Sequence, residues 1–463
     1  MDILDKAIDF ALKLGAKFIE AKYVRQSQLS IRYVDGSLRS ISSGDDEGIS
    51  IRIFMNGAWG FGAGNSIETE QVFNLVEKAF KMAKTNSERI KEKYELKYSK
   101  SYKARSIIKT KIDFDNVAIE EKVDLVKEIE RSMFKLDKRI KSTNTNYNEN
   151  KDIIHVKNSL GNDVYKEENY LYLSSTAYSL ENGVRGFGRE SKGGVGGFEI
   201  ITEKNALEIG ESAAKKAIEQ LRAKSVKAGK YVCILDPIIT GVFAHEGIGH
   251  PAEADSIVEK NSVLEGMLGK VIASEQVTII DNPLIEKAFG YYEYDDEGFM
   301  ARPRKIIERG ILKEYLNNLE TASILNMNIN ASSRADSYLN EPLVRMSNIY
   351  FEKGDMSFDE MVGEVKFGIY AKGFHYGYVI PSNGQYTFKC EYGYIIEKGG
   401  IKHPIKDISL TGLILETLKK IDGVGKDLII ESVGFCGKEG QWVRVGDGGP
   451  HVRVSEIVVG GLE

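Results

Sequence analysis

The apolar positions near the start of the chain predict one helix followed by antiparallel strands. Over residues 4–14, apolar side chains recur with the spacing of one helix face. Asp35-Gly36 and Asn56-Gly57 then separate stretches in which apolar and polar residues alternate, and both dipeptides favour the tight turns of β-hairpins. The patterns that follow predict helices over residues 67–92, 118–137 and 206–221, and strands over residues 139–147, 152–158 and 163–179.

The second half of the chain is richer in strands and is punctuated by glycine. Residues 222–229 are polar and weakly patterned, as is typical of a domain boundary. Beyond them we expect a buried strand over 231–235, hairpins over 306–312 and 394–401, and helices near 238–255, 318–326, 357–370 and 409–421. The sequence therefore predicts a two-domain α+β protein: a mixed helix and antiparallel-strand domain over residues 1–225, and a strand-rich domain over residues 226–463.

Composition agrees with a folded protein of more than one core. The chain has 463 residues, of which 42% are hydrophobic and 28% charged, with a net charge of -5; this length exceeds one ordinary core. Acidic and basic residues are interleaved, so we expect no nucleic-acid ligand. No apolar run approaches the ~20 residues that span a membrane, and the N-terminus resembles no signal peptide. The three scattered cysteines suit a reducing compartment, so we expect a cytoplasmic protein.

Residues 240–251 hold the most informative side chains: His245, Glu246 and His250. In the helix of many zinc peptidases, two histidines four positions apart lie about 40° apart around the axis, with a glutamate beside the first. Here the separation is five positions, which gives about 140° on a regular helix. Two imidazoles at that angle do not share one ion, so a metal site at these residues requires a distorted helix.

The residues between the two histidines favour such a distortion. Gly247 and Gly249 adopt conformations that other residues resist, and Pro251 cannot donate a backbone hydrogen bond. A one-residue π-bulge, common at functional sites, would restore convergence of the histidines. The alternative is two unrelated histidines in a core helix. With six histidines in the whole chain, this pattern favours the metal site.

A catalytic zinc needs a third protein ligand, and several residues are candidates from local pattern. Glycines flank Cys436 and leave room for a close approach, whereas Cys233 lies in an apolar strand and is expected in the core. Glu253 and Asp255 follow the motif closely and remain alternatives. Local pattern thus favours Cys436 without excluding the two carboxylates.

The motif and several later segments resemble the TldD/PmbA metalloproteases. The similar segments are residues 245–255, 294–298, 341–348, 368–370, 433–441 and 459–461. The family divides into catalytic TldD-like subunits and PmbA-like (TldE-like) partners without the metal motif. Because this chain retains His245, Glu246, His250 and Cys436, it resembles the catalytic branch.

That resemblance implies zinc held by His245, His250 and Cys436, and a dimer with a restricted active-site cavity that degrades unfolded polypeptides or matures peptides. The dimer partner is a second copy or a PmbA/TldE-like paralogue. Glu246 is then the general base that takes a proton from water and delivers it to the leaving amine. Competing interpretations are a non-enzymatic partner or regulatory subunit and a zinc amidase of small molecules.

Other segments are less informative. We expect the first half, with the single histidine His155, to act as scaffold, substrate channel or dimer contact. Asp295, Asp296 and Glu297 are expected to form a solvated turn rather than a substrate contact. Residues 373–384 suit a substrate groove and a surface loop equally. His375 and His451 are expected to be ordinary polar residues.

Overall fold

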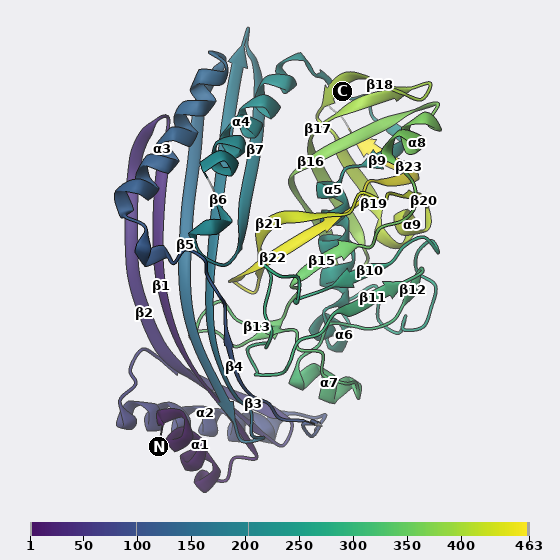
Figure 1. Ribbon diagram of the computed structural model, residues 1–463. Coiled ribbons are helices and arrows are strands. Elements are labelled where there is room, and N and C mark those ends of the chain that lie inside the picture. Colours follow the sequence, from purple (N-terminus) through teal and green to yellow (C-terminus); the bar gives the residue numbers. More distant parts are fainter. Residues whose placement is uncertain (1, 99, 202, 461–463) are drawn as a thin grey trace.

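A computed structural model of the chain describes residues 2–98, 100–201 and 203–460. The long strands of the N-terminal half form a tall, curved sheet, and the C-terminal half packs beside it (Figure 1). The fold is α+β, as the sequence predicts. None of the helices in the described segments is long and apolar enough to cross a membrane.

The N-terminal sheet has seven strands. Its order is β3 (Ala58–Gly64), β2 (Ser37–Met55), β1 (Phe18–Val34), β5 (Ile140–Asn158), β6 (Asp163–Glu181) and β4 (Lys103–Ile107), and β7 (Val184–Val195) also pairs with β6. Both predicted hairpin turns are present, and Asp35, Gly36, Asn56 and Gly57 all have positive φ, as such turns require. The two strands expected over 139–158 are one continuous strand, β5.

The predicted N-terminal helices are all present. They are α1 (Ile3–Leu14), α2 (Thr69–Arg89), α3 (Ile119–Leu136) and α4 (Glu203–Glu219). The first two pack together at one end of the sheet, and α3 and α4 pack together towards the other end (Figure 1). Their apolar faces bury separate clusters, around Val76 for the first pair and around Ile129 for the second.

The C-terminal half contains two sheets. One comprises β16 (Phe367–Ile380), β9 (Gly229–Leu235), β23 (Val452–Gly460), β19 (Ser409–Leu413), β17 (Gln385–Glu397), β18 (Gly400–Lys406) and β8 (Lys224–Ser225), with β20 (Ile421–Val424) on β23. The other runs β12 (Ile311–Leu312), β11 (Arg304–Glu308), β10 (Ile279–Asp281), β15 (Asn348–Phe351), β22 (Gln441–Gly449) and β21 (Ile429–Lys438). A further pair is β13 (Ser333–Arg334) with β14 (Leu343–Val344).

Two helices predicted for this half were too long. The structure has α5 (Pro237–Val242), α6 (Ala254–Val258), α7 (Leu319–Leu325), α8 (Phe358–Gly363) and α9 (Ile414–Lys419). The expected helix over 357–370 ends at Gly363, because residues 368–371 pair in parallel with β9. The expected helix over 409–421 begins only at Ile414, because residues 409–413 pair with β17 and β23. Tertiary strand pairing therefore overrides the local pattern at both places.

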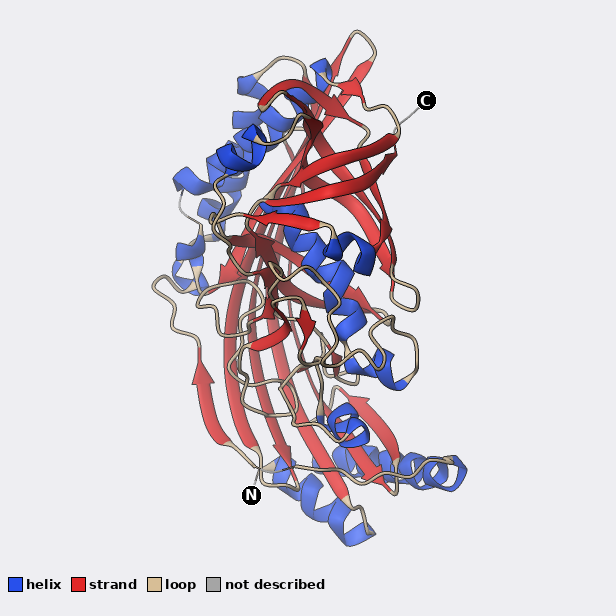
Figure 2. Cartoon of the chain, turned by 90° about the vertical axis from the view of Figure 1, so that its right-hand side faces the viewer, coloured by secondary structure: helices blue, strands red, loops and turns tan. Residues whose placement is uncertain are grey.

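Helix α5 lies between the two C-terminal sheets. It contacts β9 and β16 of one sheet and β15 and β22 of the other, and Figure 2 shows helices among the strands of this half. Residues Ile239–Val242 are buried there. This central position fixes the segment that carries His245 against the strands on either side.

Gly241 permits the close approach of α5 to β22. A Cβ atom at this position would lie 2.6 Å from the backbone nitrogen of Gly448, and the backbone of β22 is held by its pairing with β15 and β21. We expect Gly241→Ala to lower the free energy of unfolding by about 1–3 kcal/mol, the usual cost of overpacking. Denaturant titration measures this.

The control for that variant is Gly363→Ala at the end of α8, where no atom lies within 4 Å of an added Cβ. It should change stability much less. If both substitutions lower the free energy of unfolding equally, the contact with β22 is not what requires glycine at position 241.

Candidate metal centre

Helix α5 continues directly into a wider helical turn that carries the histidines. The Asp236 side chain accepts a hydrogen bond from the Ile239 backbone and starts the helix. Residues Phe243–Gly249 then form a π-helix, in which the His250 backbone N–H donates to the His245 carbonyl. This five-residue hydrogen bond places the two histidines one turn apart. The predicted distortion is therefore confirmed.

The glycines of this segment serve packing. Gly249 has an ordinary helical φ of -57°, so conformational freedom is not required there. An added Cβ would lie 1.9 Å from the Met346 sulfur at Gly249, and 2.4 Å from Ile414 at Gly247. The π-helical turn is thus pressed against residues of the surrounding core, which leaves space only for glycine.

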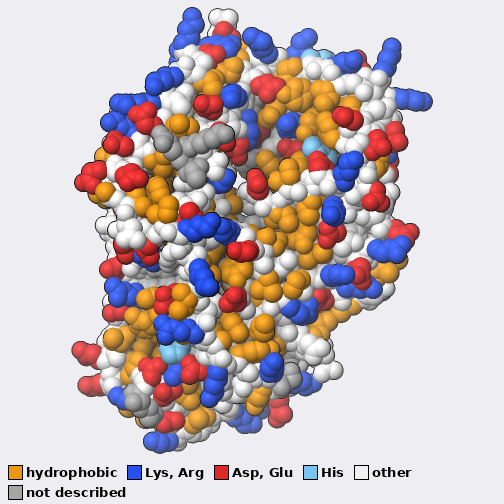
Figure 3. All heavy atoms as spheres, viewed as in Figure 1, with side chains coloured by type: hydrophobic (Ala, Val, Ile, Leu, Met, Phe, Trp, Pro, Cys, Tyr) orange, Lys and Arg blue, Asp and Glu red, His pale blue; other side chains and the backbone are white. Residues whose placement is uncertain are grey.

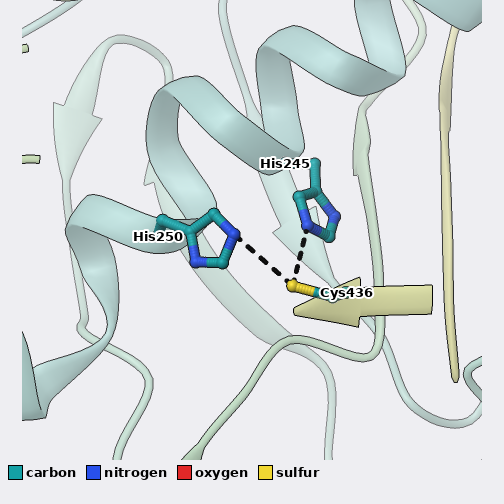
Figure 4. A group of neighbouring side chains, drawn as sticks. All are labelled: His245, His250 and Cys436. Carbon is teal, nitrogen blue, oxygen red and sulfur yellow. Dashed lines mark hydrogen bonds between the residues drawn. The ribbon is translucent and has the colours of Figure 1, made fainter. Parts of the chain in front are cut away.

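Cys436, on β21, meets the two histidines (Figure 4). Its sulfur lies 3.2 Å from Nε2 of His245 and 3.4 Å from Nε2 of His250. The three potential ligand atoms lie within 4.8 Å of one another. Arg345 is fully buried beside them and donates a hydrogen bond to the Cys436 carbonyl. Residues that are 186 or more positions apart in the sequence thus converge on one point.

Cys436 and the two histidines stabilise the charged forms of one another. Burial alone would raise the pKa of the Cys436 thiol, but His245 and His250 outweigh it and lower that pKa to about 4. Burial likewise opposes the charged form of His245, yet Cys436 raises its pKa to about 9. The thiolate, which is the form that binds metals, is therefore favoured at neutral pH.

Glu253 and Asp255 lie next to His250 and Lys438, on the periphery of the three candidate ligands. One oxygen of Glu253 is 3.1 Å from Nδ1 of His250, and Lys438 donates to both carboxylates. Burial raises the pKa of Glu253, but Lys438 and His250 outweigh it and lower that pKa to about 2. One oxygen of each residue accepts from the ammonium group. Neither carboxylate belongs to the group of converging ligand atoms, which comprises His245, His250 and Cys436.

Glu246 faces a large cavity between the two halves of the chain. The cavity has a volume of about 1360 Å³ and is lined by residues of β7 and α4 on one side and by His245, Glu246 and residues 429–435 of β21 on the other. The structure thus places the carboxylate next to the candidate ligands and open to incoming molecules. The N-terminal half forms one wall of this cavity; its role as scaffold, substrate channel or dimer contact stays a prediction.

The sequence pattern missed several residues near the site. Lys438 was not predicted to have a role, although it stands two positions after Cys436. His451 lines the cavity, and its Nε2 lies 2.8 Å from the Tyr370 hydroxyl. The run 373–384, expected to be a substrate groove or a surface loop, comprises the end of β16 and the turn that leads into β17. Phe374 and His375 of this run line the cavity. Lys438 and His451 contact residues far away in the sequence, so no local pattern identifies them.

The solvated turn expected at Asp295, Asp296 and Glu297 was wrong. These residues are 1%, 7% and 0% exposed. Lys166 of β6 donates to Asp296 at 2.8 Å, and Arg52 of β2 pairs with Glu297. Asp296 and Glu297 thus pair with cations of the N-terminal sheet and join the two halves of the chain, whereas Asp295 accepts hydrogen bonds from backbone N–H groups, including that of Ser333.

Comparison with known proteins agrees with this geometry. Three family models match the chain: PmbA/TldA metallopeptidase domain 1 over residues 19–83, the central domain over 112–221 and the C-terminal domain over 228–461. The chain belongs to the PmbA/TldD metallopeptidase family. These models divide the N-terminal half further, and the division of the chain into two domains at residue 225 stays a prediction.

Relatives within the PmbA/TldD family span nearly the whole chain. A metalloprotease of Methanocaldococcus jannaschii is 39% identical over 431 residues, which cover 93% of this chain and 94% of the relative. A protein of Saccharolobus solfataricus named zinc metalloprotease TldD homolog is 32% identical and covers 98% of this chain and 99% of the relative. These names support a protease that uses a metal.

Solved structures show the same fold. TldE from Thermococcus kodakarensis has a TM-score of 0.78 at 20% identity, with 99% of this chain and all (100%) of that chain covered. A Thermotoga maritima protein described as a modulator of DNA gyrase has a TM-score of 0.79 at 22% identity and covers 99% of each chain. At such identities the comparison establishes the PmbA/TldD fold alone.

Proposed function

We propose that this chain is a zinc-dependent peptidase that hydrolyses peptide bonds in unfolded or extended polypeptides. His245, His250 and Cys436 hold the zinc, and Glu246 is the general base. The observation that carries the proposal is the convergence of three ligand atoms within 4.8 Å beside a carboxylate that lines a large cavity.

The donor set suits zinc. Imidazole nitrogen and cysteine thiolate are ordinary zinc ligands, and three protein ligands leave one position open for chemistry. Both histidines direct Nε2 towards the sulfur, so the same type of nitrogen is available from each ring. When bound, zinc supplies Lewis acidity, which polarises the scissile carbonyl and makes water more acidic.

Glu246 carries out the proton transfers. Its place immediately after His245 and at the cavity wall brings the carboxylate to the side from which water and substrate enter. The carboxylate takes a proton from the attacking water and delivers it to the leaving amine. These two transfers convert an unreactive nucleophile and a poor leaving group into reactive ones.

The cavity and its rim support an extended substrate. β21 is the last strand of its sheet, and residues 429–435 of this strand line the cavity. An extended peptide paired with such an edge gains main-chain hydrogen bonds whatever its sequence, and β21 would guide it towards Cys436. A folded domain of 100 residues has a radius of gyration of about 13 Å, too large for this cavity.

The proposal also includes a partner and a location. We propose a dimer with a second copy or with a PmbA/TldE-like paralogue, and a cytoplasmic location. Nucleic acid is not proposed as a ligand, because Lys and Arg side chains are interspersed with Asp and Glu over the face shown in Figure 3. A membrane is not proposed as a partner either.

Removal of the metal tests the proposed function. Protein stripped with a chelator should lose cleavage of unfolded casein, and stoichiometric zinc should restore it, because the three ligands act only through the ion. Gel electrophoresis and metal analysis on the same samples provide the measurement. Full cleavage by stripped protein would contradict the proposal. Cleavage of small amides without cleavage of casein would favour a zinc amidase. A protein that binds zinc again but hydrolyses neither substrate would favour a non-enzymatic partner or regulatory subunit.

A further inference from the structure

Lys438 joins the segment that carries Cys436 to the segment that carries His250. It is the last residue of β21, two positions beyond Cys436. Its Nζ donates to Glu253 Oε2 at 3.0 Å, to Asp255 Oδ2 at 2.6 Å and to the Val344 carbonyl at 3.2 Å. An ammonium group has three hydrogens, so these contacts use all of its donors.

The contact is largely shielded from water. The side chains of Lys438, Glu253 and Asp255 are 15%, 1% and 25% exposed. Charges in such surroundings are screened little by salt, and loss of one partner leaves the others without compensation. The ion pairs therefore hold the two segments, which are 185 positions apart at Lys438 and Glu253, in one arrangement.

Glu253 transmits this arrangement to a metal ligand. The oxygen that accepts from Lys438, Oε2, also lies 3.1 Å from Nδ1 of His250. A carboxylate at Nδ1 keeps the proton there and leaves Nε2 free as a ligand, and that Nε2 lies 3.4 Å from the Cys436 sulfur. By contrast, Nδ1 of His245 is buried without a hydrogen-bond partner among the described residues. The support is specific to His250.

We propose that Lys438 is a positioning residue which, with Glu253 and Asp255, forms a clamp that sets the separation of His250 and Cys436 for one metal ion. None of the three is itself a ligand. The inference rests on the proposed zinc site and adds the residues that assemble it. The clamp connects the two segments that carry the ligands, so its loss should weaken metal binding.

Zinc affinity of the full-length protein tests the clamp. Lys438→Met keeps much of the side-chain length and removes the charge, and we expect its zinc dissociation constant to rise by about 10–100-fold, as for other residues that support a ligand. Competition with a chromophoric chelator measures this constant. The Co²⁺-substituted variant should also show an altered visible spectrum, because the thiolate and imidazole are no longer held in place.

Lys389→Met is the matched control. Lys389 lies in the same half of the chain, and its side chain is 23% exposed and pairs with Asp407 at 3.8 Å. Its replacement therefore removes a lysine charge and leaves the bonds of Lys438 to Glu253 and Asp255 in place. Zinc affinity and the cobalt spectrum should match the wild type. If Lys389→Met weakens binding as much as Lys438→Met does, the effect is a general one of charge and the clamp is contradicted.

A double-mutant cycle separates positioning from folding. Lys438→Met leaves the buried Glu253 carboxylate without its ammonium partner, whereas Lys438→Met with Glu253→Gln removes both of these charges. If the clamp acts as one unit, the double variant should bind zinc no more weakly than the weaker single variant. The melting temperature of the metal-free proteins reports folding. Multiplicative losses in zinc affinity would overturn the proposal.

His245→Ala distinguishes failure of the clamp from failure of the proposed function. If this variant retains wild-type zinc affinity, the metal site itself is wrong. If it loses zinc while Lys438→Met binds as the wild type does, the metal site stands and the clamp alone is contradicted.

Discussion

Replacing Glu246 with alanine should abolish cleavage of unfolded polypeptides and leave zinc bound at about one ion per chain. General acid–base catalysis contributes about 10²–10⁴-fold to a rate, so we expect the turnover number to fall by at least this range. The ion remains because Glu246 lies outside the three ligand atoms that converge. Parallel measurement of metal content and peptide cleavage gives the result.

The control for this variant is Glu208→Ala. Glu208 lines the same cavity from α4, so its replacement removes a carboxylate from the opposite wall and leaves the proposed chemistry intact. Cleavage by this variant should remain close to that of the wild type. Undiminished cleavage by Glu246→Ala would reject Glu246 as the base and direct attention to other carboxylates of the cavity.

Cys436→Ala and His250→Ala should each lose most of the bound zinc, and with it all cleavage. Each substitution leaves two of the three protein ligands that a catalytic zinc site uses, so the affinity for the ion should fall. Metal analysis should then find a zinc content far below one ion per chain. Added zinc should not restore cleavage at concentrations that restore the stripped wild type.

Cys233→Ala serves as the control, because Cys233 is fully buried in the core of the same half. Burial raises the pKa of its thiol, so it has no tendency to bind a metal, and zinc content should be unchanged. If Cys436→Ala keeps its zinc, a carboxylate must replace the sulfur. Glu253 would be the first candidate, since its Oε1 is buried without a hydrogen-bond partner among the described residues.

Local features of the fold could be predicted where the backbone itself sets the structure. Asp35-Gly36 and Asn56-Gly57 form the expected turns, because few residue pairs accept positive φ at both positions. The helix over residues 3–14 follows from its apolar spacing. Residues 364–370 were assigned to a helix in error, because parallel pairing with β9 leaves no local trace. Strand partners distant in sequence decide such segments.

The same distinction holds for the candidate site. The five-position spacing of His245 and His250, with glycines and a proline near them, predicted a distorted helix, and the π-helical turn over Phe243–Gly249 confirms it. The third member was less certain from the residues alone, because Glu253, Asp255 and Cys436 all carry suitable donor atoms. Only the folded chain shows which of these atoms faces the histidines.

The sequence by itself determined the α+β class, the turns and the break in helical regularity at the histidines, because these depend on residues close together along the chain. Tertiary structure alone decided that Cys436 contacts the histidines, that Lys438 donates hydrogen bonds to Glu253 and Asp255, and that the acidic residues 295–297 are buried. Each of those outcomes depends on a partner contributed by a remote strand. Neighbouring residues do not encode which distant charge or donor compensates for burial.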